Sequence, residues 1–510
     1  METSRNKTIT KNTFYLYARM LLMMGVSLYT SRVVLQNLGI EDYGIYQAVG
    51  GIVGFLDMVN GFMVNGVTRF LTIEMGIGNV GKLHRTFCTT MYIQLGVVLV
   101  IVLLAETAGL WFLFNKMVIP DSRLTAALFV LQFSIVSAVF SISQVPYTAI
   151  ITSHEKMGVF AGISIFDAFA KLGIVLVLPF VIWIDSLILY SFLLMLTGLA
   201  SMSITRIYCI RHFKESHFKF VFDKTIFNQI ISYSLWNVIS TLGTVFSSHG
   251  MVLLTNMFFA PTIVAARAIS VVVSGQAMRF VENFKQAVSP QIVKSFAVGD
   301  ISRSHSLLLT STKFSFYMVL LISLPLLLMI EPVLKVWLGE VPEYTAEFSR
   351  IILVQNLFYT IVTCFYTAIY AKGELRGFVL TCSILKFIQF PIVYILFKMG
   401  YSPLLLSWAS LIVYIIIALW LEPYLLVKVV GYTYQEVYKV IKNCLSVTIC
   451  SLPFPLFIYF STDVNTIQGF VCVCTITLIN ILLVVFYIGL DINMRQKVLI
   501  IVGEKLFRKW

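Results

Sequence analysis

The stretch from Thr86 to Phe114, TFCTTMYIQLGVVLVIVLLAETAGLWFLF, decides the fold class. It holds a single charged residue, Glu106, and as an α-helix it would exceed the roughly 30 Å of a bilayer's hydrocarbon core. Comparable runs recur from about Phe14 to Tyr487. Lipid offers the backbone no hydrogen bonds, and no run alternates as a barrel strand must, so the sequence predicts an all-α polytopic membrane protein.

The composition of the whole chain agrees with a lipid environment. Of the 510 residues, 59% are hydrophobic and only 12% are charged, which would require an implausibly large dry core in a soluble protein. The first apolar run is too long for a cleaved signal, so we expect no processing. The eight cysteines include no Cys-x-x-Cys pair, and we interpret them as small core residues without disulfides or a metal site.

Hydropathy predicts about fourteen spans, near residues 13–38, 43–70, 86–114, 123–152, 157–183, 186–210, 225–258, 262–296, 304–330, 346–371, 377–399, 404–427, 438–460 and 465–489. If the N-terminus is cytoplasmic, twenty-three Lys and Arg residues lie in inside segments. Only four lie outside, at Lys116, Arg123, Lys335 and Lys398. By the positive-inside rule this asymmetry predicts that both termini are cytoplasmic. The net charge of +13 thus indicates membrane orientation, and we expect no nucleic-acid partner.

A weak internal repeat recurs at an offset of 219 residues. Tyr147-Thr148-Ala149-Ile150 matches Tyr366-Thr367-Ala368-Ile369, and further matches at the same offset fall at the same places in the span order. The repeat predicts two six-helix lobes of one orientation, residues 1–218 and 219–430. Residues 431–510 would then form two additional spans and a basic cytoplasmic tail.

The motifs that resemble those of enzymes lack the context that an enzyme needs. Gly76-Ile77-Gly78-Asn79-Val80-Gly81-Lys82 satisfies a dinucleotide fingerprint and most of a phosphate loop. It joins two membrane helices, however, and Leu83 stands where a phosphate loop needs Ser or Thr, so we interpret it as a glycine turn. The six histidines form no His-x-x-x-His pair, and there is no nucleophile elbow. We expect no enzymatic activity, no cofactor and no catalytic metal.

The charges inside the spans carry the functional information. An ionisable side chain at bilayer depth costs at least about 2.5 to 3.5 kcal/mol and normally faces a cavity. The basic members are Arg19, Arg32, Arg69, Lys171, Arg267, Arg279, Lys285, Lys313 and Lys386, and the acidic ones noted are Asp57, Glu106, Asp167 and Glu282. The cationic excess favours an anionic substrate group over a site built for cations.

The eighth span, residues 262–296, carries a polar stripe. Arg267 and Lys285 are eighteen residues apart, five helical turns, and so share one face about 27 Å apart. Near that line lie Ser270, Ser274, Glu282 and Ser289. Arg279 and Glu282, at i and i+3, are placed to pair. The alternative is that these basic side chains snorkel to the membrane interfaces.

The first and fifth spans offer further charged groups. On the first span, Arg19 and Arg32 could reach a cleft or snorkel. On the fifth span, Asp167 and Lys171 at i and i+4 could neutralise each other as a structural pair. If they face a cavity instead, Asp167 becomes a candidate for proton coupling.

The layout of six, six and two spans, together with Leu38-Gly39-Ile40-Glu41-Asp42-Tyr43-Gly44-Ile45-Tyr46, resembles the polysaccharide exporter family. This family belongs to the multidrug, oligosaccharidyl-lipid and polysaccharide exporter (MOP) superfamily. The quoted segment joins the first two spans and looks like the Leu-Gly, Asp/Glu-Tyr-Gly turn of bacterial O-antigen and capsule flippases.

The resemblance implies two lobes around a central cavity, alternating access, and export of an undecaprenyl-diphosphate-linked oligosaccharide across the bacterial inner membrane. Such a chain would serve O-antigen and lipopolysaccharide, capsule or exopolysaccharide biosynthesis. Expected partners are this lipid-linked substrate, membrane lipids and a glycan polymerase or glycosyltransferases. Candidates to bind the headgroup are Arg19, Arg32, Arg267, Arg279, Lys285 and Lys171, and candidates for ion coupling are Asp57, Asp167 and Glu282.

Two rival functions stay open. A cation-coupled multidrug antiporter of the same superfamily would need carboxylates to dominate its cavity. A non-transporting membrane scaffold for glycan assembly would leave the buried arginines dispensable.

Overall fold

The computed structural model describes the backbone of residues 2–77, 79–154, 156–372, 375–464, 466–496 and 499. Within these ranges, side chains are described except at 2–20, 57–66, 69, 73, 76, 157, 233–242, 244, 286–287, 290, 297, 375–376 and 378–379. The described residues form helices joined by short turns, with no strand among them. The all-α prediction is therefore confirmed.

The helices, in chain order, begin with α1 (Glu2–Ile77), α2 (Val80–Leu104), η1 (Ala105–Gly109), α3 (Leu110–Asn115), η2 (Asp121–Arg123), α4 (Leu124–Ser153), α5 (Met157–Val177), η3 (Leu178–Phe180), α6 (Ser186–His212), η4 (Lys214–Ser216), α7 (Lys224–Val245), η5 (Phe246–Gly250) and α8 (Met251–Phe258). They continue with α9 (Pro261–Ala297), α10 (Ile301–Leu338), α11 (Thr345–Lys372), α12 (Leu375–Lys398), α13 (Leu405–Ile416), η6 (Ile417–Leu421), α14 (Glu422–Leu425), η7 (Leu426–Val430), α15 (Tyr434–Ser451), α16 (Pro453–Ser461), α17 (Ile467–Val484) and η8 (Val485–Gly489).

Every predicted span coincides with a helical stretch. The first two lie in α1, which breaks at Gly39, where φ is 78°. A residue with a Cβ rarely adopts that conformation, so glycine is required there. Among the described residues, 11 helical segments are long and apolar enough to cross a membrane, and the chain is a multi-pass membrane protein. The count of fourteen spans and the internal repeat stay predictions.

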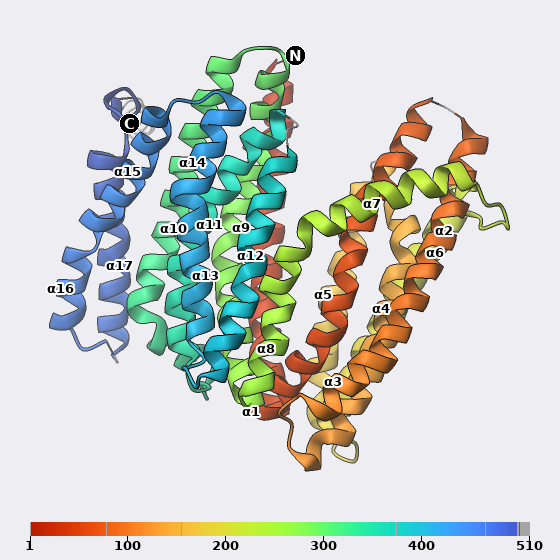
Figure 1. Cartoon of the computed structure of the whole chain (residues 1–510). Coiled ribbons are helices and arrows are strands. Elements are labelled where there is room, and N and C mark those ends of the chain that lie inside the picture. Colours follow the sequence, from red (N-terminus) through yellow and green to blue (C-terminus); the bar gives the residue numbers. More distant parts are fainter. Residues whose placement is uncertain are drawn as a thin grey trace. The chain divides into compact units, whose positions relative to one another are not determined.

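The chain divides into two compact units. Unit 1 comprises Met1–Ile269 and Ser383–Pro403, and unit 2 comprises Ser270–Cys382 and Leu404–Trp510. In unit 1, α4 packs on α1, α2 and α6, and in unit 2, α11 packs on α10 and α13. Figure 1 shows these neighbours running side by side. The predicted lobe boundaries are not tested by this division and stay a prediction.

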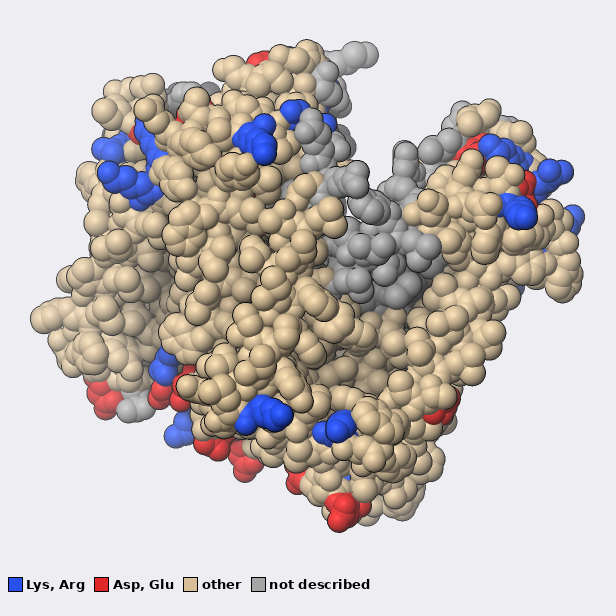
Figure 2. Space-filling view, viewed as in Figure 1, with Lys and Arg blue, Asp and Glu red and all other residues tan. Residues whose placement is uncertain are grey.

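The surface of each unit fits a lipid surrounding. On the face shown in Figure 2, charged side chains lie mostly near the ends of the helices, and the band between is almost free of them. Large apolar side chains stay exposed outside the core, among them Phe180 at 79%, Trp183 at 80% and Phe460 at 81%. Such exposure is unfavourable in water, so these side chains are placed to face lipid.

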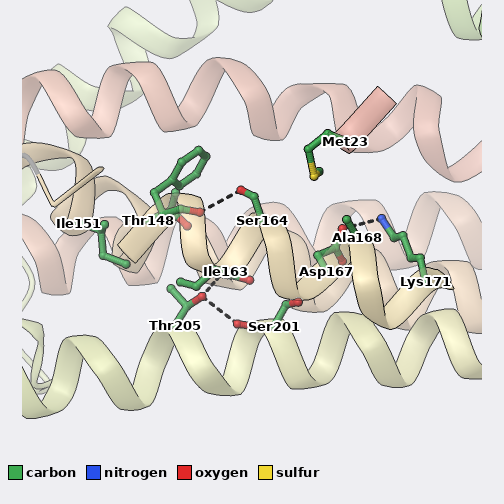
Figure 3. A pocket seen from close by; sticks show the side chains of 12 residues that line it. Met23, Thr148, Ile151, Ile163, Ser164, Asp167, Ala168, Lys171, Ser201 and Thr205 are labelled. Atoms are coloured by element: carbon green, nitrogen blue, oxygen red, sulfur yellow. Dashed lines mark hydrogen bonds and ion pairs between the residues drawn. The ribbon is translucent and has the colours of Figure 1, made fainter. Parts of the chain in front are cut away.

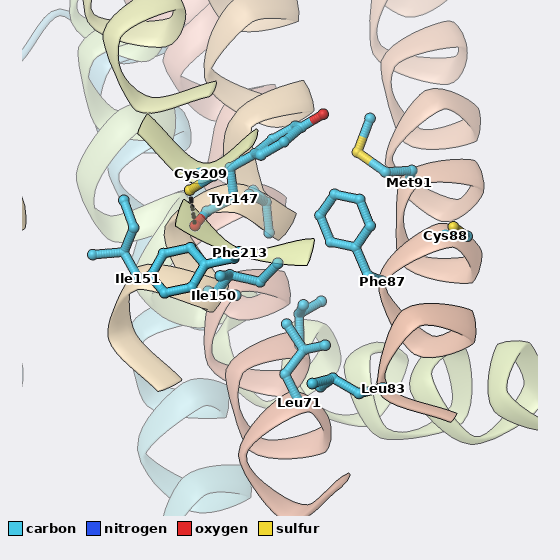
Figure 4. Close-up of a cluster of buried hydrophobic side chains, with 13 residues drawn as sticks. Leu71, Leu83, Phe87, Cys88, Met91, Tyr147, Ile150, Ile151, Cys209 and Phe213 are labelled. Atoms are coloured by element: carbon cyan, nitrogen blue, oxygen red, sulfur yellow. Dashed lines mark hydrogen bonds between the residues drawn. The ribbon is translucent and has the colours of Figure 1, made fainter. Parts of the chain in front are cut away.

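A cluster of apolar side chains holds one end of unit 1 together (Figure 4). Phe87 on α2 is fully buried and its ring meets that of Tyr147 on α4 edge-on, with centroids 5.2 Å apart. Cys88 and Cys209 are both fully buried in this cluster, as predicted for small core residues. The Cys209 thiol donates to the Tyr147 carbonyl oxygen at 3.5 Å, which joins α6 to α4.

An ion-pair network fastens the opposite end of unit 1, predicted to be external. Arg123 on η2 donates from Nε to Asp42 Oδ1 at 2.8 Å and from Nη1 to Asp185 Oδ2 at 2.6 Å. Asp185 also caps α6 by accepting from the backbone N–H groups of Leu187 and Ile188. A single guanidinium therefore joins the turn after Gly39, the start of α4 and the start of α6.

Candidate functional site

A pocket of about 420 Å³ lies within unit 1, between α1, α4, α5 and α6, and its mainly apolar lining carries several polar side chains. Figure 3 shows its lining, to which α5 contributes Ser164, Asp167 and Lys171 and α6 contributes Ser201 and Thr205. Asp167 and Lys171 are ionisable groups inside a long apolar helix, which makes this pocket a candidate functional site.

Asp167 and Lys171 form the charged part of this pocket. Lys171 Nζ lies 2.8 Å from Asp167 Oδ2, one helical turn away on α5. The Lys171 side chain remains 48% exposed and that of Asp167 37% exposed. Both line the pocket. The residues form the predicted pair and line this pocket of unit 1, and the role of Asp167 in ion coupling stays a prediction.

The wall formed by α4 and α6 presents uncharged polar groups. Gln144 Nε2 donates to Thr205 Oγ1 at 2.8 Å, and Thr205 in turn donates to the Ser201 carbonyl oxygen. The Ser201 hydroxyl is buried and has no hydrogen-bond partner among the described residues. Hydroxyls and amides of this kind can exchange hydrogen bonds with water or with the hydroxyl groups of a sugar.

Arg206 borders this wall and lies near the end of the predicted span 186–210. Its Nη2 donates to Ser143 Oγ at 2.8 Å, and its guanidinium lies over the Tyr147 ring at 5.4 Å. Stacking on an aromatic ring is typical of arginine and favours a fixed position. Sequence reasoning placed Arg206 at the end of a span and so gave it only an orientation role.

A second basic grouping in unit 1 contains Arg267. This residue stands near the start of α9, within electrostatic range of His249 on η5. Gly54 lets α1 approach here, because a Cβ at that position would lie 2.8 Å from the His249 ring. Arg267 Nε is buried without a hydrogen-bond partner, and no carboxylate pairs with its guanidinium among the described residues. A buried guanidinium N–H without an acceptor is unfavourable, so a hydrogen-bond acceptor at the Arg267 Nε would be stabilising.

The remainder of the α9 stripe faces α11 rather than an open cavity. Ser270 donates to the Thr345 carbonyl oxygen at 3.1 Å, and Lys285 Nζ donates to that of Thr363 at 2.7 Å. Ser274 likewise bonds Asn356 Oδ1 at 3.0 Å. Ser270, Ser274 and Lys285 are thus satisfied by groups of α11, whereas Glu282 of the same predicted stripe is exposed.

The remaining predicted site residues are dispersed. Arg279 is half-buried and forms no ion pair with the exposed Glu282, which lies within electrostatic range of Lys285 instead. Arg32 is half-buried on α1. The side chains of Arg19 and Asp57 lie outside the described residues. Their predicted roles in headgroup binding and ion coupling stay predictions.

Glu422 was missed by sequence reasoning. It is fully buried, lies between the π-helical turns η6 and η7, and interacts electrostatically with Lys285 and Cys364. Such π-helical turns are frequent at functional sites. In the sequence, Glu422 is a single acidic residue inside a predicted span. The list of charges inside the spans omitted it.

No protein-family model matches the chain, and no curated protein sequence does. Solved structures do match. The chain is similar to the lipid II flippase MurJ in an inward closed conformation, with 15% identity, a TM-score of 0.68, and coverage of 92% of this chain and 98% of MurJ. It is also similar to an inward-facing MATE family multidrug resistance transporter of the MOP superfamily, with 12% identity, a TM-score of 0.66 and coverage of 82% and 96%.

A MOP superfamily transporter from Pyrococcus furiosus is similar at 13% identity, with a TM-score of 0.57 and coverage of 85% of this chain and 96% of that one. At these identities the likeness establishes the fold. The chain has the fold of MOP superfamily transporters, of which the predicted polysaccharide exporters are one branch.

Proposed function

We propose that the chain is a MOP superfamily transporter that moves an undecaprenyl-diphosphate-linked oligosaccharide across the bacterial inner membrane by alternating access. The cargo would be a repeat unit of O-antigen, capsule or exopolysaccharide, and both termini would be cytoplasmic. The fold shared with a lipid II flippase and with MATE transporters supports a transporter, and the cationic excess within the spans supports an anionic headgroup.

The observation that carries the proposal is the environment of Arg267. Its Nε is buried without a hydrogen-bond partner among the described residues, and its described titratable neighbour His249 carries no negative charge. A diphosphate would supply the missing acceptors through charge-assisted hydrogen bonds, which the planar guanidinium can form in pairs. Such a group would place negative charge beside the half-buried guanidinium and give its Nε an acceptor.

The polar side chains in the pocket of unit 1 suit the glycan portion of this substrate. Lys171 can contact phosphate as a point charge, and the hydroxyl and amide groups of α4 and α6 can bond sugar hydroxyls. Asp167 is already paired with Lys171, so the pair brings no net negative charge to the pocket. A site for cationic drugs would need such a charge, and this difference favours the flippase over the multidrug antiporter.

A flipping assay tests the proposal. Vesicles containing the purified protein and a fluorescent diphosphate-linked oligosaccharide lipid are used to compare wild type, Arg267→Gln and the control Arg350→Gln. Arg350 pairs with Glu331 at 2.7 Å, and both side chains are more than a third exposed, so its loss should matter little. We expect wild type and the control to flip the lipid. Arg267→Gln should be slower by about tenfold or more, the loss expected for one hydrogen bond to a charged group.

Each rival function predicts a different result in the same vesicles. A multidrug antiporter would expel a cationic dye in exchange for protons or sodium and leave the diphosphate lipid unflipped. A scaffold would move neither the dye nor the diphosphate lipid, and Arg267→Gln would behave as wild type with both probes.

A further inference from the structure

A second pocket, of about 630 Å³, lies within unit 2 between the first turns of α10 and α15. The α10 wall follows one helix face, and Asp491 borders the pocket beyond η8. The polar lining residues are Ser302, His305, Ser306, Thr310 and Lys313 of α10, Glu436, Lys439 and Asn443 of α15, and Asp491. Both helices begin on the side predicted to be cytoplasmic. In Figure 2, basic side chains gather at the upper left, where Figure 1 places α15.

One side of the α10–α15 pocket is held by interactions that are already complete. Lys313 Nζ lies 3.1 Å from Asp491 Oδ2. The Tyr317 hydroxyl donates to Asn443 Oδ1 and lies 3.2 Å from the Gly489 carbonyl oxygen. These contacts tie α10 to α15 and to the end of η8. They leave neither Lys313 nor Asp491 in need of a further counter-charge.

The other donors of the pocket have no hydrogen-bond partner among the described residues, and such donors can bind an anion. Glu436 accepts from the backbone N–H and the hydroxyl of Thr433 at 3.0 and 2.7 Å as a helix cap, and its negative charge lies within electrostatic range of His305. The positive charge available to an anion in this part of the pocket is therefore that of Lys439. Lys439 lines the pocket without an ion pair among the described residues. His305 stacks on Tyr432 with ring centroids 3.6 Å apart, and its Nε2 is buried with no hydrogen-bond partner among the described residues.

The chemistry around Lys439 and His305 narrows the kind of anion. Ser306 and Thr310 follow His305 on the same face of α10 and add hydroxyl groups to the wall. An ammonium, an imidazole N–H and hydroxyls together match the several acceptor oxygens of a phosphate. Leu309 and Val440 line the pocket as well, so an attached apolar chain could leave along the helices.

We infer that the α10–α15 pocket binds a phosphate group at the inner membrane surface, with Lys439 and His305 as its donors. The phosphate would belong either to the headgroup of an anionic phospholipid or to a free phosphate in the cytoplasm. This site is separate from the site proposed for the transported headgroup, and the inference does not depend on what the chain transports.

Native mass spectrometry of the full chain in detergent tests the inference, with phosphatidylglycerol, phosphatidylcholine and inorganic phosphate as probes. The variants are Lys439→Gln and His305→Gln, and Lys442→Gln is the matched control. Lys442 is an exposed lysine on the same helix that does not line the pocket. A thermal melt without added lipid establishes that each variant is folded.

For a lipid source, phosphatidylglycerol should bind wild type and Lys442→Gln equally, and Lys439→Gln about fivefold more weakly, the effect expected for one basic residue near a lipid surface. For a free source, inorganic phosphate should show the same dependence on Lys439 and compete with the lipid. Either result supports the phosphate site and identifies its source. Equal binding of every probe to all folded variants, or equal losses in Lys439→Gln and Lys442→Gln, would overturn it.

Discussion

Replacement of Arg123 by Ala should destabilise unit 1 more than the loss of an ordinary surface ion pair. Exposed pairs contribute about 0 to 1 kcal/mol, whereas removing one partner of a buried pair costs about 3 to 5 kcal/mol. The Arg123 side chain is 24% exposed, and those of Asp42 and Asp185 are 17% and 31% exposed. Since one guanidinium serves both carboxylates at intermediate burial, we expect the free energy of unfolding to fall by about 2 to 3 kcal/mol.

Equilibrium unfolding in mixed detergent micelles measures this change, with Arg350→Ala as the matched control. Arg350 and Glu331 form a single ion pair whose side chains are 37% and 65% exposed, so the control should lose less than about 1 kcal/mol. A double-mutant cycle with Asp42→Asn isolates the coupling between Arg123 and Asp42. Equal and small losses in both arginine variants, with no coupling in the cycle, would refute the reasoning.

The same network predicts a pH dependence. Burial raises the pKa of Asp185, but hydrogen bonds from Arg123 and from the α6 backbone outweigh burial, so the net pKa is lowered from 3.8. A lowered carboxyl pKa adds stability that is present above the unfolded value and is lost as the pH falls through the folded one. At Asp42 burial outweighs Arg123, and the pKa is raised. The difference between wild type and Arg123→Ala should therefore persist at neutral pH and shrink below about pH 4.

Two further predictions concern the core and the pocket of unit 1. Phe87→Ala should lower the free energy of unfolding by about 3 to 5 kcal/mol, because this fully buried ring would leave a cavity. Lys171→Gln should slow flipping of the diphosphate-linked lipid by about tenfold, while Lys156→Gln, an exposed lysine at the end of α5, should not.

Periodicity and hydropathy were sufficient to predict the helices. The predicted span at 186–210 matches α6 at Ser186–His212, and that at 346–371 matches α11 at Thr345–Lys372. Apolar runs, glycine turns and caps are local signals, so one sequence carries them completely. Gly39 illustrates this: it lies in the segment that joins the first two predicted spans, and α1 breaks there.

The partners of the polar side chains could not be predicted in the same way. The spacing of Ser270, Ser274 and Lys285 predicted a common face, but nothing in that spacing indicates that α11 would satisfy it. Arg123 was counted only as an outside charge, although it meets carboxylates from two distant segments. Pairing of this kind depends on tertiary packing, and one sequence without its relatives gives no record of it.

The most direct test of the central claim, that Arg267 binds the negative charge of the lipid headgroup, compares two lipids carrying the same glycan. One bears a diphosphate and the other an uncharged linkage, and both are offered in vesicles to wild type and Arg267→Gln. We predict that wild type moves the diphosphate lipid about tenfold or more faster, and that the variant loses most of this preference. Equal rates for both lipids in wild type, or an undiminished preference in Arg267→Gln, would contradict the account.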